Sequence, residues 1–251
     1  MRAAWTCALA LLPVAALAQA PSEPASRIHF GVEHSHLDRG LADWDEASLR
    51  VSRQLGPRSL VEGGLTETRR FGLKDTQLGA SFTTPLSDRL AASAELSYSP
   101  THRVLPHYSA GGTLQYEFAP AWLAHAGLRH TRYDDARVER GMLMLEHYFG
   151  NFSASAAWVP VRALGTNASN AELRGSWYYR DGSSITLIAS RGDEATQVGP
   201  GQIALADVRS LAWTGRHKIA PSLALTWSLF RVHQGNFYTR TGASAGVQYA
   251  F

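Results

Sequence analysis

The chain ends in SAGVQYAF, residues 244–251, and stops on an aromatic side chain. Within this stretch the large side chains Val247, Tyr249 and Phe251 alternate with small or polar residues. Such alternation is the period of a β-strand with one apolar face and one polar face. Because chain ends are poorly ordered unless something holds them, this ending predicts a last strand that pairs with another part of the chain.

The same alternation recurs along the whole chain. In LALTWSLF (residues 223–230), Leu225 and Trp227 share one face, and Thr226 lies on the other. Further examples are RIHFGVEH (27–34), SAGGTLQYEF (109–118) and NAELRGSWYYR (170–180). Short turn sequences separate these runs, and longer polar connections lie between them. The turns are Gly56-Pro57, Pro85 to Asp88, Ala119-Pro120, Gly150-Asn151, Asp181-Gly182 and Ala220-Pro221; the longer connections are residues 37–44, 70–74, 101–106, 162–167 and 193–201.

This regularity predicts an all-β fold, a single antiparallel up-and-down transmembrane β-barrel of about 14 strands, within a range of about 12 to 16. Outer-membrane barrels of bacteria alternate short periplasmic turns with longer outward loops. An even strand number then places both termini on the periplasmic side of the outer membrane of a Gram-negative bacterium. After residue 20 no apolar run approaches the roughly 20 residues of a membrane-spanning helix.

A secreted soluble β-sandwich is the alternative to a membrane barrel. A sandwich turns its apolar faces inward and carries most of its charge outside. Here an apolar stripe recurs in nearly every predicted strand, and aromatic residues gather beside turns, as expected for the girdle of a membrane interface. We therefore expect the apolar faces to contact lipid and the polar faces to line a lumen. The girdle candidates are Phe118 with Trp122, Phe149 with Phe152, and Tyr178 with Tyr179.

The first 18 residues read as a secretory signal peptide, because Arg2 precedes an apolar run that ends in small residues. Cleavage after Ala18 leaves residues 19–26 as a short periplasmic leader and residues 27–251 as the barrel. The only cysteine, Cys7, lies in the signal peptide, so the mature chain offers no disulfide, thiolate metal site or cysteine nucleophile. The formal net charge of +3 is spread thinly, so nucleic acid is not expected as a partner.

Projecting the alternation inward assigns a set of charged residues to the lumen. They can form a polar path for a hydrophilic solute, or a ladder of paired charges that plugs the barrel. A barrel of about 14 strands lies between the filled eight-stranded barrels and the open channels of 16 to 18 strands, so both readings stay open. Mixed signs of charge argue against strong ion selectivity. The candidates are Glu33, Arg50, Glu62, Glu95, Glu117, Arg129, Arg140, Glu146, Glu172 and Arg174.

The densest cluster of titratable residues is not expected to be a catalytic or metal site. It contains His29, Glu33, His34 and His36. Adjacent residues of a strand point to opposite faces, so His34 lies on the side opposite Glu33 and the four side chains do not converge. Neither a metal nor a cofactor is therefore expected.

No catalytic residue is predicted elsewhere. A Ser–His pairing is formally possible across strands, for example Ser109 or Ser153 with His125 or His147, but serine is so common in this chain that the pairing indicates nothing. Neither a G-x-S-x-G motif at a strand-to-helix turn nor the metal motif H-E-x-x-H stands out. An enzyme is the less favoured class.

The ending carries a recognisable pattern. Ser244, Gly246, Tyr249 and Phe251 match S-x-G-x-x-Y-x-F, which resembles the carboxy-terminal insertion signal that the barrel-assembly machinery reads in outer-membrane proteins. GVEHSHLDRGLADWDEASLRVSRQLG (31–56) and GNFYTRTGASAGVQYAF (235–251) resemble the beginning and end of YaiO-type outer-membrane β-barrel proteins. The resemblance covers nearly the whole chain from Arg27 onward. It implies an outer-membrane location and supplies no functional residue; some related barrels accompany exopolysaccharide synthesis.

Taken together, we expect a pore or accessory barrel for the passage or surface handling of a hydrophilic solute such as a saccharide or exopolysaccharide. Tyr133 and Tyr178 are candidate rings for stacking on sugars. A barrel enzyme acting on lipid and a structural or adhesive barrel with a plugged lumen are the alternatives. Expected partners are outer-membrane lipid, the barrel-assembly machinery during biogenesis, and proteins of polysaccharide synthesis or export.

Overall fold

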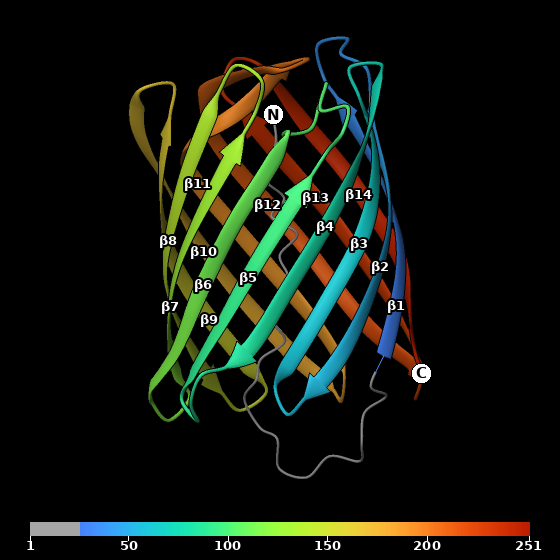
Figure 1. The fold of residues 1–251 in the computed structure, drawn as a ribbon, viewed down its shortest axis with the longest axis vertical. Coiled ribbons are helices and arrows are strands. Elements are labelled where there is room, and N and C mark those ends of the chain that lie inside the picture. The colour runs from blue at the N-terminus through green and yellow to red at the C-terminus, as the bar shows by residue number, and fades with distance from the viewer. Residues whose placement is uncertain (1–25) are drawn as a thin grey trace.

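The computed structural model describes residues 26–251, which form one closed barrel of antiparallel strands (Figure 1). Each strand pairs with its neighbours in the sequence, and β1 closes the barrel against β14. The predicted fold class and the predicted 14 strands are confirmed. The strands are β1 (Ser26–Leu37), β2 (Trp44–Gly56), β3 (Ser59–Arg70), β4 (Leu73–Pro85), β5 (Leu90–Tyr98), β6 (Tyr108–Ala119), β7 (Trp122–Arg132), β8 (Arg137–Phe149), β9 (Phe152–Ala163), β10 (Thr166–Arg180), β11 (Ser183–Gly199), β12 (Gln202–Ala220), β13 (Leu223–Gln234) and β14 (Tyr238–Ala250).

The predicted signal peptide, residues 1–18, lies outside the described residues, as does the predicted leader apart from its last residue. The first strand begins at Ser26, one residue before the predicted start of the barrel. Among residues 26–251, no helix has the length and apolar character needed to cross a membrane.

The end of the chain is held by its beginning. The backbone N–H of Ser26 donates to the carbonyl oxygen of Phe251 at 3.1 Å, and the N–H of Phe251 donates back to Ser26 at 2.9 Å. The same register continues along the seam and places Gly31 opposite Gly246. Closure pairs the backbone groups that an open sheet edge would leave unsatisfied in hydrocarbon. The terminal aromatic residue is therefore fixed at the seam of the barrel.

The outer face of the barrel is apolar along its middle. Leu128 is 78% exposed, and Leu96 and Leu173 are each 64% exposed. Glu95 and Arg129, their neighbours in the strands, are only partly exposed. An apolar outer band around a polar interior is typical of barrels that cross a lipid bilayer.

The two ends of the barrel carry different connections. One end of the barrel, here called the terminal end, is where β1 begins and β14 ends. Tight turns lie there at every predicted turn site. The opposite end, here called the far end, carries two longer connections, residues 38–43 and 99–107. The predicted long connections at 70–74, 162–167 and 193–201 are wrong. The strands run on through most of these segments, to tight turns at Phe71-Gly72, Leu164-Gly165 and Pro200-Gly201.

The hairpin of β11 and β12, the two longest strands, leaves the barrel wall before its turn. Pairing of β11 with β10 stops at Gly192, opposite Asn170, and pairing of β12 with β13 stops at Val208, opposite Gln234. Among the described strands, residues 193–207 therefore pair only with each other. Figure 1 shows this orange segment, here called the hairpin tip, lying across the far end of the barrel.

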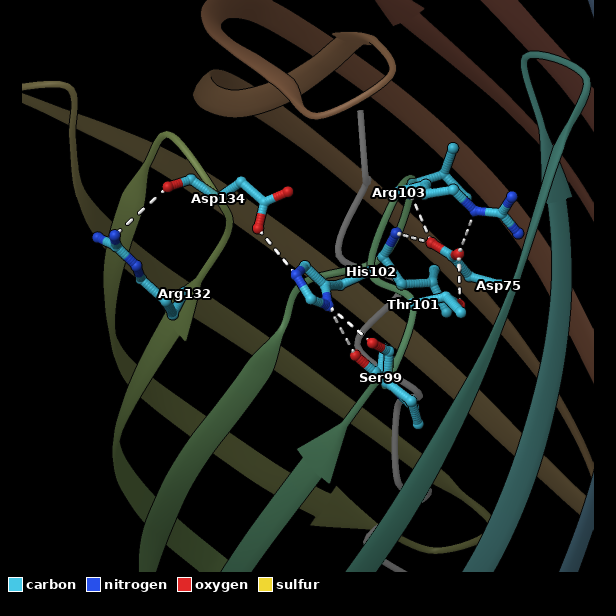
Figure 2. A network of polar contacts seen from close by, with 10 residues as sticks. Asp75, Ser99, Thr101, His102, Arg103, Arg132 and Asp134 are labelled. Atoms are coloured by element: carbon cyan, nitrogen blue, oxygen red, sulfur yellow. Dashed lines mark hydrogen bonds and ion pairs between the residues drawn. The ribbon is translucent and has the colours of Figure 1, made fainter.

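The connection between β5 and β6, residues 99–107, is fixed to the barrel by one carboxylate (Figure 2). Asp75 of β4 accepts hydrogen bonds from the backbone N–H groups of Val104 at 2.6 Å and Leu105 at 3.0 Å, and from the Thr101 hydroxyl at 2.8 Å. Val104 and Leu105 are each only 1% exposed. Because hydrogen bonds to an ionised acceptor are strong, this segment, here called the anchored loop, is held in place.

Further polar contacts tie the far-end connections together. Nε2 of His102 in the anchored loop lies 3.0 Å from a carboxylate oxygen of Asp134, between β7 and β8 (Figure 2). In the connection between β1 and β2, Asp38 accepts a hydrogen bond from the backbone N–H of Thr239 at 2.7 Å, which lowers the pKa of that carboxyl. The far end is therefore a set of joined segments.

Aromatic rings form a belt on the outside of the terminal end, where a girdle was predicted. Neighbouring rings of this belt lie between 4.0 and 6.4 Å apart. Tyr178 is not part of it, because its hydroxyl lies 3.2 Å from the buried hydroxyl of Ser153. Alternation along β10 separates the two tyrosines, because Tyr178 shares the inner face of buried Ser176 and Tyr179 shares the outer face of exposed Trp177. The belt contains Phe118, Trp122, His147, Phe149, Phe152, Trp177 and Tyr179.

Candidate functional site in the barrel lumen

The structure spreads the ten predicted lumen residues around the wall from β1 to β10. Each of them is partly buried and has an exposed residue directly beside it in its strand, which is the pattern of an inward-pointing side chain. They do not converge on one point. They are Glu33, Arg50, Glu62, Glu95, Glu117, Arg129, Arg140, Glu146, Glu172 and Arg174.

Opposite charges are paired along this wall. The guanidinium of Arg129 on β7 donates to the carboxylate of Glu95 on β5, across the intervening strand β6. The Arg174 guanidinium donates to the Glu172 carboxylate at 3.0 Å. Pairing lowers the cost of keeping charges in a confined space and leaves no long row of one sign.

A cavity of about 150 Å³ lies against the lumen side of β2 to β7. Gly64 of β3 and Gly79 of β4 are partners in register, and neither places a side chain in the cavity. Pro106 of the anchored loop also lines it. The polar lining consists of Arg50, Glu62, Thr66, Gln77, Ser81, Glu95, Ser97, Ser109, Arg129, Thr131 and Tyr133. This lining offers both hydrogen-bond donors and acceptors.

At the far end, the sequence reasoning missed a buried cluster around Trp44. The guanidinium groups of Arg70 and Arg240 lie 4.6 and 5.1 Å from the centre of the Trp44 ring. Each arginine also has a carboxylate nearby, Glu46 at 3.6 Å from Arg70 and Glu33 at 3.8 Å from Arg240. Strand alternation could have found the missed charges, since Glu46 shares the face of Arg50 and Arg70 shares that of Glu62.

This cluster continues into an apolar core inside the barrel. Leu37, Phe230 and Tyr238 pack with Trp44, and Ala206 and Val208 at the base of the hairpin tip join them. The lumen is therefore polar beside the cavity and apolar below the hairpin tip.

The Ser–His pairings considered above do not form. The Ser109 hydroxyl lies 2.8 Å from the Ser97 hydroxyl, and the Ser153 hydroxyl lies 3.2 Å from that of Tyr178. His125 faces Glu146 instead, at 3.2 Å. The remaining candidate, His147, stacks on Trp122 in the outer belt, with ring centres 4.0 Å apart. The rings of Tyr148 and Tyr178 stack 6.3 Å apart and form an aromatic surface in the lumen.

The histidines near the start of the barrel are divided between its two faces. His29 lies inside and contacts Thr226 at 3.0 Å. His34 and His36 are exposed on the outer face, where each lies 2.9 Å from an aspartate, Asp45 and Asp43 respectively. Within residues 26–251, no group of three or more His, Cys, Asp or Glu side chains is arranged to hold a metal ion.

A closed barrel with an apolar outside and a charge-paired lumen defines an outer-membrane β-barrel protein of the porin-like kind. The model of the YaiO membrane β-barrel domain matches residues 25–196, more than half of the chain. The chain therefore belongs to the YaiO membrane β-barrel family, and the resemblance seen in the sequence is confirmed. No curated protein matches the chain.

Solved structures of other barrels share the fold at low sequence identity. A bacterial polysaccharide outer membrane secretin aligns with a TM-score of 0.61 at 9% identity, over 92% of this chain and 100% of that one. The CymD monoaromatic hydrocarbon channel aligns at 0.60 and 11% identity, over 92% and 89%. The KdgM porin aligns at 0.50 and 10% identity, over 89% and 99%. At these identities the likeness shows the fold alone.

Proposed function

We propose that this barrel passes an uncharged hydrophilic solute, a saccharide, through its lumen across the outer membrane. The observation that carries the proposal is the cavity of about 150 Å³ beside β2 to β7. Its lining combines paired charges with hydroxyl groups and one tyrosine ring, Tyr133.

Matched charges favour a sugar over an ion. A row of charges of one sign along the lumen would concentrate counter-ions and exclude ions of the same sign. In the Glu95–Arg129 pair the two charges offset each other. The guanidinium keeps further N–H donors, and the carboxylate keeps further acceptor positions, for hydrogen bonds to a solute. Tyr133 in the cavity and the stacked pair of Tyr148 and Tyr178 supply flat apolar faces with polar rims, which suit the faces of sugar rings.

Two of the structural neighbours are named for related tasks, one as a polysaccharide secretin and one as a porin.

The proposal extends to orientation: both termini face the periplasm, because the tight turns gather at the terminal end, as they do on the periplasmic side of outer-membrane barrels. It also extends to biogenesis, with Ser244, Gly246, Tyr249 and Phe251 as the residues read by the assembly machinery. Proteins of polysaccharide synthesis or export are the proposed partners.

Two glycines on opposite faces of the wall provide a matched test. Gly79 faces the lumen in the cavity, where an added Cβ meets its nearest atom only at 3.9 Å. Gly175 of β10 is exposed on the outside, and an added Cβ there meets nothing within 4 Å. We expect Gly79→Phe to fill the cavity and lower sugar uptake into proteoliposomes several-fold, whereas Gly175→Phe leaves uptake unchanged. Sugar uptake that is the same in both variants would contradict the proposal.

A further inference from the structure

We propose that the hairpin tip, residues 193–207, is a lid that closes the far end of the lumen and swings away from the wall to admit solute. The inference rests on the proposed function and describes how passage is regulated. It starts from the observation that β11 and β12 hydrogen-bond to the wall only as far as Gly192 and Val208.

Beyond these two residues the tip folds inward. β11 comes close to β9, although β10 lies between them in the sheet. Ala195 and Leu205 of the tip pack against the buried side chains of Val159, Val161 and Ala163 on β9. A hairpin that continued the wall would leave these lumen-side residues uncovered. The tip therefore covers the mouth (Figure 1).

Two hydrogen bonds act as latches for the closed position. The Tyr238 hydroxyl donates to the carbonyl oxygen of Gln197 at 2.8 Å and joins the tip to β14. The Asn170 side-chain amide donates to the Glu194 carboxylate at 2.6 Å and joins it to β10. The latches thus lie on two separate strands of the wall.

Gly192 is placed as the hinge. Its φ of +150° is a conformation that residues with a side chain rarely adopt. A Cβ at this position would lie 2.3 Å from the carbonyl oxygen of Ser169 and 2.5 Å from the Cα of Asn170. The bend toward the lumen therefore requires glycine.

The closed position also contains groups that oppose it. The side-chain amides of Gln197 and Gln234 are 0% exposed, and neither has a hydrogen-bond partner within residues 26–251. The buried hydroxyl of Thr196 also has no hydrogen-bond partner within residues 26–251. Buried polar groups without partners are costly, and opening would return them to water. The lid is thus held by apolar packing and two latches against an internal cost.

The anchored loop shows the contrasting design. Its backbone is bound by several hydrogen bonds to a single buried carboxylate, Asp75. It forms a fixed part of the far end beside the cavity, and the hairpin tip forms the moving part.

A reversible crosslink tests the lid directly. Residues 26–251 contain no cysteine, so Ala195→Cys combined with Val161→Cys introduces a unique pair between tip and wall. A short methanethiosulfonate crosslinker should lower sugar uptake into proteoliposomes several-fold, and dithiothreitol should restore it. The control pair is Ser176→Cys with Thr186→Cys, which joins the wall strands β10 and β11 at two residues whose hydroxyls lie 2.9 Å apart. Crosslinking that pair should leave uptake unchanged.

Two variants test the opening. In the first, residues 195–205 are replaced by an Asn-Gly turn that joins Glu194 to Ala206, its partner in register. This shortened barrel should admit sugar several-fold faster than the wild type. The second, Tyr238→Phe, removes one latch without removing residues and should give a smaller increase, so the test still stands if the shortened barrel fails to fold.

The outcomes separate the lid from the proposed function. If the wild type admits sugar and all three changes leave the rate untouched, the lid is wrong while passage through the lumen stands. If neither the wild type nor the folded shortened barrel admits sugar, both proposals fail. Uptake that appears only in the shortened barrel supports both.

Discussion

The imidazole Nε2 of His29 lies 3.0 Å from the hydroxyl of Thr226, although β14 separates their strands β1 and β13. The contact passes over Gly246. A Cβ on that glycine would come within 2.7 Å of both side-chain atoms. The glycine in the last strand therefore lets a side chain from the first strand reach across the seam inside the barrel.

Gly246→Ala should weaken this seam. The added methyl group collides with His29, Thr226 and the backbone of β1, and overpacking of this kind costs about 1–3 kcal/mol. We expect a lower urea midpoint for unfolding from detergent micelles. Gly175→Ala is the control, since a Cβ there meets nothing within 4 Å. An equal midpoint for the two variants would show that the crossing contact does not constrain residue 246.

Changing one member of the cavity ion pair should alter ion selectivity. Glu95→Gln leaves Arg129 as an uncompensated positive charge, so the reversal potential in a salt gradient should shift toward anion preference. Arg129→Gln should shift it toward cations, and the double variant should return close to the wild type. Measurements on the shortened barrel described above keep the conductance large enough to read. Selectivity that ignores both single changes would place the conducting path elsewhere.

Asp75→Asn should loosen the anchored loop. The change removes the charge that two backbone amides and a hydroxyl bind, and hydrogen bonds to a charged group contribute about 1.5–3 kcal/mol each. Hydrogen exchange at Val104 and Leu105 should become faster by orders of magnitude, while the wall strands keep their protection. The exposed Asp135→Asn serves as the matched control. Unchanged exchange in the loop would mean that its apolar packing alone holds it.

The two sides of the wall should respond differently to lipid. Trp213 stands on the outer face at 49% exposure, whereas Trp44 is 3% exposed inside. In single-tryptophan variants, with the others replaced by phenylalanine, brominated acyl chains should quench Trp213 fluorescence strongly and Trp44 fluorescence little. Strong quenching of Trp44 would reverse the assignment of inside and outside.

Local alternation was enough to predict the wall, because a strand with one lipid face and one lumen face repeats every two residues. It identified the strand number and the turn sites. It did not anticipate the cluster around Trp44, since Arg240 is brought to that ring only by the closing of β14 on β1, whereas Arg70 comes from the neighbouring strand β3.

The hairpin tip was missed for a different reason. Residues 193–201 are rich in polar side chains and glycine, which predicted a loop, whereas they form a self-paired hairpin bent at Gly192. The requirement for glycine there comes from the approach of Ser169 and Asn170 on another strand, which is a tertiary contact.

The hydrogen bonds that join β11 to β10 and β12 to β13 end at Gly192 and Val208. The sequence between these two residues can therefore be lengthened, exchanged or replaced by a foreign peptide without breaking a hydrogen bond between the wall strands. If the hairpin tip is the proposed lid, selection can change which molecules enter while leaving the wall strands and their assembly unchanged. If the barrel has the proposed orientation, the same independence makes this position suitable for displaying an epitope at the cell surface.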